Sequence, residues 1–306
     1  MPEKYIVSSK APMGLYLRSE PIVVPATKIA ILPMGHAVTK IAEASAKPWW
    51  QVSTEIAGNP TTGYVNSTFL IKDSSYTPPQ PANTIKPVHL PVPSGTTVTP
   101  NKKLWAYPLN ESGQPKRDPS DTPANRIKQL TGIIKHLKVK TSARYAATST
   151  STYCNIYAYD YCYLGSVYLP RVWWNQQAIL KLKAGASVSP IYGQTVDEIN
   201  ANSLYNWLRD WGNDYGWDRV TEVTEMQKAA NNGQVAIICA KNKTPNKSGH
   251  ICAVVPETSN DKATYNGTTV VIPLQSQAGR SNYDYFARTW WTMNIFSNFG
   301  FWINTA

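Results

Sequence analysis

The stretch STSTYCNIYAYDYCYLG, residues 149–165, places Cys154 directly after a run of hydroxyl side chains. Cys154 and Cys162 stand two helical turns apart, and Ser151 or Thr152 would cap a helix that begins here. The free N–H groups and the positive end of the dipole in the first helical turn stabilise a thiolate. The position therefore predicts a nucleophile. The alternative is a packing role, because free cysteine is among the most buried residue types.

A cysteine nucleophile needs a base, and the chain has 4 histidines. His250 opens the short apolar strand GHICAVV, where it shares one face with Cys252 and Val254 and would point toward the packed helices. The other three lie in the N-terminal β segments, in a Pro-rich stretch and in a Lys-flanked helix (His36, His89 and His136). We therefore predict that His250 pairs with Cys154.

The imidazole of such a pair is commonly oriented by a third polar group. The next predicted strand, VVIPLQSQAG, carries Gln275 and Gln277 on one face. A neutral amide fixes a histidine ring by hydrogen bonding and adds no charge. The order of Cys on a helix, His on a strand and Gln on the following strand predicts a Cys-His-amide site.

The elements that would position this site form the second half of the chain. Apolar periodicity predicts helices within residues 121–139, 153–165, 201–212 and 224–233. The expected caps are Asp121 or Thr122 before Pro123 for the first helix, Asn202 for the third, and a capping box of Thr224 and Gln227 for the fourth. Strands follow in QVAIICA, GHICAVV and TTVVIPLQSQAG. Helices followed by consecutive strands predict an α+β domain with an antiparallel sheet and helices against one face.

The first part of the chain differs in pattern. Residues 1–72 hold short β segments separated by Gly and Pro, which predict a small all-β barrel or sandwich. Residues 73–120 are Pro-rich, typical of an extended spacer, in which residues 104–107 (LWAY) would dock onto a neighbouring domain. The predicted domains are therefore 1–72 and 121–306, joined by the linker 73–120.

Composition limits the partners. The net charge is +11 and the pI is about 9.4, which favours polyanions such as wall polymers, anionic lipid or nucleic acid. Dense Lys/Arg runs and nucleic-acid motifs are absent from the sequence, so we expect no nucleic-acid partner. No apolar run approaches the ~20 residues of a membrane helix. Metal-ligand spacing and Gly-rich phosphate loops are also absent, so we expect no cofactor.

These motifs together carry a resemblance. The ordered set STSTYCNIYAYDY, EINANSLYNWLRDWGNDYGW, AANNGQVAIICAKN, SGHICAVVPE and PLQSQAGRSN resembles the papain-like cell-wall cysteine hydrolases of the NlpC/CHAP superfamily over roughly residues 141–282. Residues 1–72 resemble the bacterial SH3-like domains that accompany such hydrolases. The tyrosines after Asn155 depart from the aliphatic residues common in the family pattern, which indicates a reshaped cleft or different helix packing.

The resemblance implies an SH3-like barrel followed by a papain-like α+β domain. It implies Cys154 as nucleophile, His250 as general base and acid, and Gln277 as orienting residue, with Gln275 as the alternative. The implied function is hydrolysis of an amide in the peptide stem of peptidoglycan, with an endopeptidase favoured over an amidase. We expect a monomer that acts outside the cytoplasm, although the start MPEKYIVSSK lacks the apolar core of a signal peptide.

Two rival functions remain open at this point. The papain-like half could be an inactive wall-binding or glycan-binding domain, or the Cys-His pair could serve an acyltransferase or a lipid hydrolase. Cys239 and Cys252 lie on strands joined by one loop, so the alternatives for them are a disulfide or two separate thiols.

Overall fold

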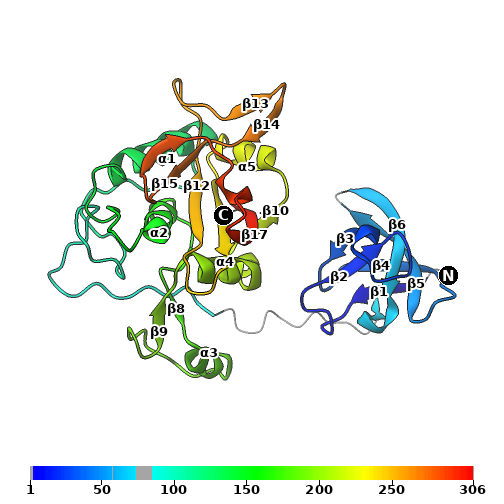
Figure 1. The fold of residues 1–306 in the computed structure, drawn as a ribbon. Helices are drawn as coiled ribbons and strands as arrows, with labels where there is room; N and C mark the ends of the chain where they lie inside the picture. The colour runs from blue at the N-terminus through cyan, green and yellow to red at the C-terminus, as the bar shows by residue number, and fades with distance from the viewer. Residues whose placement is uncertain (1–2, 57, 74–84, 306) are drawn as a thin grey trace. The chain divides into compact units, whose positions relative to one another are not determined.

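The computed structural model describes residues 3–56, 58–73 and 85–305. The chain divides into two compact units, Met1–Ala82 and Asn83–Ala306 (Figure 1). The described part holds five α-helices and antiparallel sheets, which agrees with the predicted all-β segment followed by an α+β segment. No described helix is long and apolar enough to cross a membrane.

The first unit is built from short strands that pair antiparallel in the order β3-β2-β6-β5-β4-β1-β7. Alternating apolar residues point inward, and Leu17, Val52 and Val65 are fully buried in its core. The strands are β1 (Lys4–Val7), β2 (Leu15–Arg18), β3 (Lys28–Leu32), β4 (Ala37–Glu43), β5 (Trp49–Ile56), β6 (Asn59–Asn66) and β7 (Leu70–Lys72), with the short 3-10 helices η1 (Pro25–Thr27) and η2 (Ser67–Phe69).

The predicted closed barrel is not shown. Within the described residues β3 and β7 end the sheet and do not pair with each other, and β2 meets β6 through the single pair Arg18 and Tyr64. Ile31 is exposed on the outer strand β3. The sequence pattern therefore predicted correctly that this unit is all-β. Closure of a sheet into a barrel depends on pairings between strands that are distant in sequence, which local patterns do not specify.

The Pro-rich segment belongs to the second unit from residue 85 onward. Apolar side chains spaced between its prolines are buried in the main core, among them Val88, Val98 and Leu109. The patch Leu104–Tyr107 packs against the same core, as predicted for its docking. A Pro-rich chain is extended, but these apolar side chains gain by burial and hold it against the domain, so it differs there from a free spacer. Residues 74–84 of the predicted linker lie outside the described residues.

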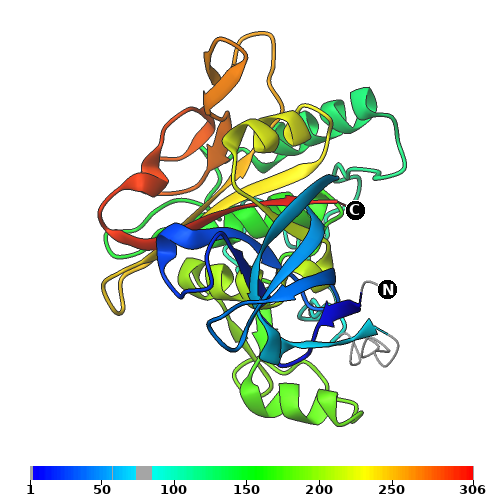
Figure 2. The same ribbon diagram turned by 90° about the vertical axis from the view of Figure 1, so that its right-hand side faces the viewer.

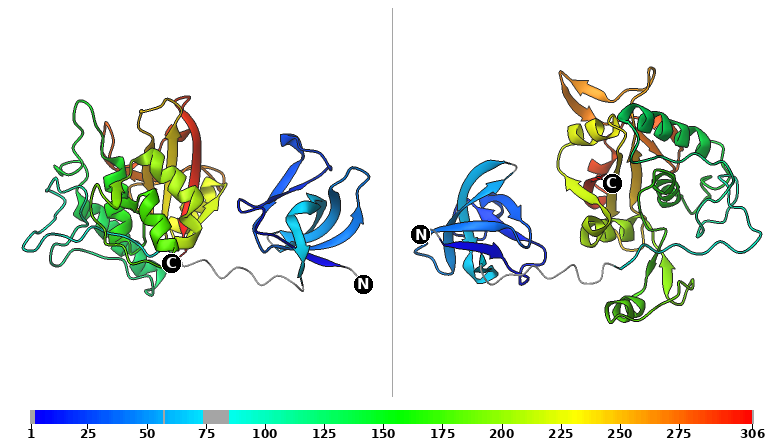
Figure 3. Two further views of the ribbon diagram at one scale, coloured as in Figure 1. Left: turned by 90° about the horizontal axis from the view of Figure 1, so that it is seen from below. Right: turned by 180° about the vertical axis from the view of Figure 1, so that it is seen from behind.

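A six-stranded sheet in the order β10-β17-β11-β12-β15-β16 forms the centre of the second unit, and every pairing in it is antiparallel. Its strands are β10 (Trp217–Val220), β11 (Val235–Asn242), β12 (His250–Val254), β15 (Gln275–Gln277), β16 (Tyr283–Phe286) and β17 (Phe296–Asn304). The predicted strands QVAIICA and GHICAVV are thus central neighbours. The hairpin of β13 (Thr264–Asn266) and β14 (Thr269–Ile272) projects from this unit (Figures 1 and 3).

Helices lie on both faces of this sheet. One core joins α1 (Pro123–Leu137), α2 (Cys154–Leu164) and α4 (Ala201–Asp210) to the residues of β11 and β12 that include Ile237, Ile251 and Ala253. The opposite core joins α5 (Val223–Ala230) and η5 (Trp290–Thr292) to Ile238 and Cys252. The prediction that helices cover one face is therefore incomplete.

A smaller subdomain extends from the second unit. It consists of the two-stranded sheet of β8 (Val172–Trp174) and β9 (Val196–Glu198) with α3 (Gln176–Lys183), and it projects at one end (Figures 1 and 2). The turn η4 (Gly212–Tyr215) connects α4 to β10. β9 matters for the site, because its last residue, Glu198, lines a cavity beside Cys154.

The helix positions agree well with the sequence, but two caps do not. Thr122 caps α1 with Pro123 in the first turn, as predicted. Asn200, not Asn202, caps α4 by accepting the N–H of Ser203. The Asn202 side chain instead binds the loop that precedes β12, through Lys247 O at 2.8 Å. Glu222 precedes α5 with no side-chain cap, so the predicted capping box at Thr224 is wrong.

Candidate active site

Cys154 is the first residue of α2, which packs against β12 (Figure 1). The helix begins there because Tyr153 leaves the helical region with φ −121° and ψ 37°. Tyr153 is the N-cap and makes no side-chain cap hydrogen bond, so the expected caps Ser151 and Thr152 are wrong. The helix start itself is confirmed, and its first N–H groups are left available.

Backbone N–H groups surround the Cys154 sulfur. Those of Ile251, Asn155 and Cys154 itself act to lower the pKa of the thiol. Burial has the larger effect and raises that pKa above its usual 9.0, since the residue is only 3% exposed. The resting thiol is therefore protonated at neutral pH, and the thiolate predicted from the helix start requires a base to form.

His250 and Gln277 lie side by side. The imidazole Nε2 is 2.6 Å from Gln277 Oε1. The Gln277 amide group donates in turn to Ser281 O at 3.3 Å, which fixes its oxygen toward the histidine. The oxygen can only accept, so Nε2 carries the proton and Nδ1 is left with the lone pair that a general base needs.

Trp290 covers the imidazole. The two ring centroids are 4.4 Å apart and the rings meet edge to face at 82°. Trp290 is held by its indole N–H, which donates to Gln275 Oε1 at 2.7 Å. Burial lowers the pKa of His250 below 6.5, and the hydrogen bond to Gln277 opposes that shift. Gln277 thus contacts the histidine directly, whereas fully buried Gln275 supports the ring that covers it.

The face of β12 that carries His250 differs from the prediction. Cys252 and Val254, which alternate with His250, pack into the core of α5 and η5. Ile251 and Ala253 face α1, α2 and α4 instead. His250 therefore lies at the start of β12 on the side of η5, where it contacts Trp290, and the adjacent Ile251 acts on the pKa of the Cys154 thiol through its backbone N–H.

Cys154 and His250 line two cavities that share lining residues. The helix cavity, of about 180 Å³, is lined by Cys154, and the strand cavity, of about 330 Å³, is lined by His250 and Gln277. Thr152 and Ser248 line both. No hydrogen bond joins the Cys154 sulfur to the imidazole among the described residues. Catalytic hydrogen bonds commonly tighten only when substrate binds, so the lack of a bond between Cys154 and His250 is compatible with a pair that forms in the substrate complex.

The helix wall of the site consists of Trp105, Tyr153, Cys154, Arg171 and Glu198. The rings of Trp105 and Tyr153 stack with centroids 4.7 Å apart. Arg171 is buried, donates through Nε to Trp105 O at 2.7 Å and pairs with Glu198. No sequence motif indicated Arg171, because an arginine bound to a backbone oxygen leaves no spacing pattern. Trp105 stood out only as part of the predicted docking patch 104–107.

The strand wall of the site consists of His250, Gln277, Arg280, Arg288 and Trp290. Of these residues, the sequence analysis predicted only His250 and Gln277. The segment around Trp290 was too interrupted to assign, since a single 3-10 turn has no periodicity to detect. The tryptophan pair at residues 290–291 was the one available hint.

A buried ion pair anchors α2 behind Cys154. Arg144 Nε lies 2.6 Å from Asp160 Oδ2, and both side chains are fully buried. Tyr145 also donates to Asp160, at 2.8 Å. Arg144 donates further to the backbone oxygens of Leu104 and Tyr107. This network joins the Pro-rich segment, the loop before α2 and the helix, and so fixes the position of the helix start.

The two remaining strand cysteines do not form a disulfide. Cys239 pairs with Ile251 and Cys252 pairs with Ile238 in the register of β11 and β12. They therefore point to opposite faces, and both are free and buried. No group of three His, Cys, Asp or Glu side chains within the described ranges could hold a metal ion.

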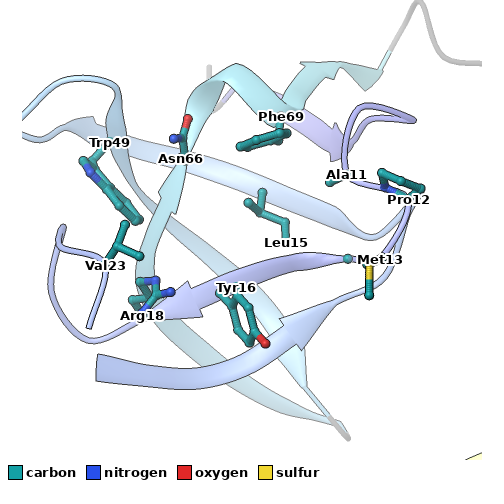
Figure 4. Close-up of a pocket in the computed structure, with 11 residues that line it drawn as sticks. Ala11, Pro12, Met13, Leu15, Tyr16, Arg18, Val23, Trp49, Asn66 and Phe69 are labelled. Carbon is teal, nitrogen blue, oxygen red and sulfur yellow. The ribbon is translucent and has the colours of Figure 1, made fainter. Parts of the chain in front are cut away.

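A further cavity, of about 360 Å³, lies within the first unit (Figure 4). Tyr16, Trp49 and Phe69 line it together with small apolar groups and Arg18. The Arg18 guanidinium donates to Val24 O at 2.7 Å and to Thr27 Oγ1 at 3.1 Å. Apart from Tyr16, Arg18 and Asn66, the residues that line this cavity are apolar or aromatic.

Comparison with known proteins adds little to this geometry. No family model and no curated protein matches the chain. Among solved structures the chain is similar to NlpC2 from Trichomonas vaginalis, at 13% identity over 96% of this chain and 74% of that chain. The TM-score of this match is 0.22, which is too low to support an argument about the fold or the function.

Proposed function

We propose that the chain is a cysteine hydrolase that cleaves an amide bond in the peptide stem of peptidoglycan. One observation carries the proposal: Cys154 begins α2, which packs against β12, and His250 begins β12 and is itself oriented by Gln277 at 2.6 Å. A thiol and an oriented neutral imidazole at the meeting point of two cavities are the parts that acyl transfer needs.

The reaction follows from these parts. His250 Nδ1 takes the thiol proton as the Cys154 sulfur attacks the amide carbon, and the carbonyl oxygen becomes an oxyanion. The imidazolium then gives its proton to the amide nitrogen, the C–N bond breaks, and an amine leaves an acyl group on the sulfur. Water, deprotonated by His250, adds to the thioester and releases the acid and the free thiol. Gln277 keeps the ring in the required tautomer throughout.

The oxyanion needs hydrogen-bond donors. The N–H of Cys154 lies at the start of α2, where it has no partner within the helix, and we propose it as one donor. The positive end of the helix dipole adds to this stabilisation. Deleting a single such donor in an acyl-transfer enzyme typically costs about 10²- to 10³-fold in rate, so the placement of the helix start matters for the rate.

We further propose that the first unit binds the wall and that the protein acts outside the cytoplasm. The net charge of +11 supports attraction to anionic wall polymers, and the aromatic cavity beside Tyr16 and Trp49 supports a binding role. We propose an endopeptidase in preference to an amidase, and a monomer without a nucleic-acid partner.

The test is digestion of purified peptidoglycan, followed by mass spectrometry of the soluble fragments. We expect wild type to release fragments that differ from intact stems by one water per cleaved amide. Cys154→Ala should release none, while Cys162→Ala, which alters a buried cysteine on the same helix, should behave as wild type. Release of fragments by the Cys154→Ala protein would contradict the proposal.

One observation favours an inactive wall-binding protein instead. Burial raises the pKa of the Cys154 thiol, and the imidazole is not hydrogen bonded to the sulfur among the described residues. Such a protein would bind purified peptidoglycan equally well as wild type and as Cys154→Ala, and neither would release fragments. A chain that cuts thioesters or ester lipids but leaves stem peptides intact would point to the acyltransferase or lipid hydrolase.

A further inference from the structure

The two cavities of the site differ in charge. Arg280 and Arg288 are the charged side chains that line the strand cavity, and no carboxylate belongs to its described lining. The helix cavity holds Arg171 and Glu198, which form an ion pair with each other. The helix cavity is therefore neutral overall, whereas the strand cavity presents positive charge next to His250.

The cations of the strand cavity are not compensated by nearby carboxylates. Arg280 is exposed, and its Nη1 donates to Thr148 O at 2.8 Å, which leaves further N–H donors toward solvent. The exposed Arg288 guanidinium lies 5.9 Å from the centre of the Tyr283 ring. Neither takes part in an ion pair among the described residues, and the nearby Asp284 is engaged by Lys140 at 3.3 Å.

The chemistry decides which part of a substrate enters this cavity. His250 delivers the proton to the departing amine, so the amine half of the cleaved amide lies on the side of the imidazole. The acyl half stays on the sulfur and lies on the side of the helix cavity. The strand cavity therefore receives the leaving group, and its positive charge faces that half of the substrate.

We propose that the strand cavity binds a carboxylate of the leaving group, and that Arg288 is a specificity-determining residue with Arg280 beside it. This inference rests on the proposed function and names its substrate class: an amide whose amine component is an amino acid or short peptide with a free carboxylate. A guanidinium binds a carboxylate through two parallel N–H donors, which gives direction as well as charge. The apolar lining from Phe286 and Ile295 fits the carbon chain of the same group.

The experiment uses two synthetic stem tetrapeptides that differ only at the C-terminus, one with a free carboxylate and one with an amide. We expect the full-length wild type to cleave the carboxylate form with a kcat/KM about tenfold or more above that of the amide form. In Arg288→Gln the preference should disappear, because the KM for the carboxylate form rises toward that for the amide form. Arg209→Gln, which removes an exposed arginine paired with Asp210 on α4, is the matched control and should keep the preference.

The outcomes separate this inference from the proposed function. Cleavage of both peptides with equal kcat/KM, or an unchanged preference in Arg288→Gln, would overturn the carboxylate site and leave the hydrolase standing. If wild type cleaves neither peptide, the hydrolase is wrong for this substrate. Binding of fluorescent forms of the same two peptides to Cys154→Ala then decides the site: weaker binding of the amide form, and loss of that difference in Arg288→Gln, supports it, and equal binding overturns it.

Discussion

The helix wall and the strand wall of the site are held in different ways. Behind Cys154, buried arginines bind backbone oxygens and carboxylates, as Arg144 does with Asp160 and Arg171 with Glu198. Around the half-buried His250, single hydrogen bonds and one ring contact suffice, namely those to Gln277 and Trp290. The comparison predicts that the proposed nucleophile is held more rigidly than the proposed base.

The largest effect is expected on the strand wall. His250→Ala removes the only proton acceptor that the account gives to Cys154, so kcat/KM on stem peptides should fall by roughly 10³-fold or more. His136→Ala is the matched control, because that histidine lies on α1, next to Glu111 and outside the lining of both cavities. Activity of His250→Ala close to that of wild type would remove the base from the account.

A substitution behind the helix wall should instead lower the free energy of unfolding. Asp160→Ala leaves the Arg144 guanidinium buried without its carboxylate, so the free energy of unfolding should decrease by about 3–5 kcal/mol. Urea denaturation measures this change. Asp210→Ala breaks the exposed pair with Arg209 and should cost less than about 1 kcal/mol. Equal losses in the two variants would contradict the rigid helix wall.

The contact between His250 and Gln277 should have an intermediate effect on the rate. A hydrogen bond to a charged group contributes about 1.5–3 kcal/mol, and the imidazole is charged when it holds the thiol proton. Gln277→Ala should therefore reduce kcat about 10- to 100-fold and leave the unfolding free energy nearly unchanged. A lower stability with unchanged kcat would make Gln277 a structural residue only.

The smallest effect tests the charge state of the pair. Burial raises the pKa of the Cys154 thiol above 9.0 and lowers that of His250 below 6.5, so both groups are neutral at pH 7. The base works only when neutral, so kcat/KM should fall as the pH drops through the pKa of His250, with a midpoint below pH 6.5. The thiolate absorbance of wild type minus Cys154→Ala should appear only above pH 9. Thiolate absorbance at pH 7 would show an ion pair instead.

Residue positions were predictable from the sequence where the residue lies on a regular helix or strand. The start of α2 at Cys154, the strand with His250 and the following strand with Gln277 follow from periodicity and punctuation, and the structure places the last two residues in contact. The catalytic roles of these residues stay predictions. The all-β character of the first part was equally readable, whereas barrel closure depends on pairings that local patterns do not specify.

The residues around the site and the helix caps could not be predicted from local sequence patterns. Trp105 arrives from a Pro-rich segment whose prolines favoured a spacer, yet its ring stacks on Tyr153 beside the nucleophile. Asn200 and Asn202 are equally good caps by type, and only packing decides between them. Burial reversed the expected shift of the Cys154 pKa, because desolvation outweighs the helix-start donors.

The most direct test of the central claim is native alkylation with iodoacetamide, with peptide mapping of all four cysteines and activity followed on the same samples. The account predicts that Cys154, which lines a cavity, reacts first, and that the fraction of activity lost equals the fraction of Cys154 modified. The same label should enter more slowly in His250→Ala. Full activity in protein whose Cys154 is completely alkylated would contradict the account.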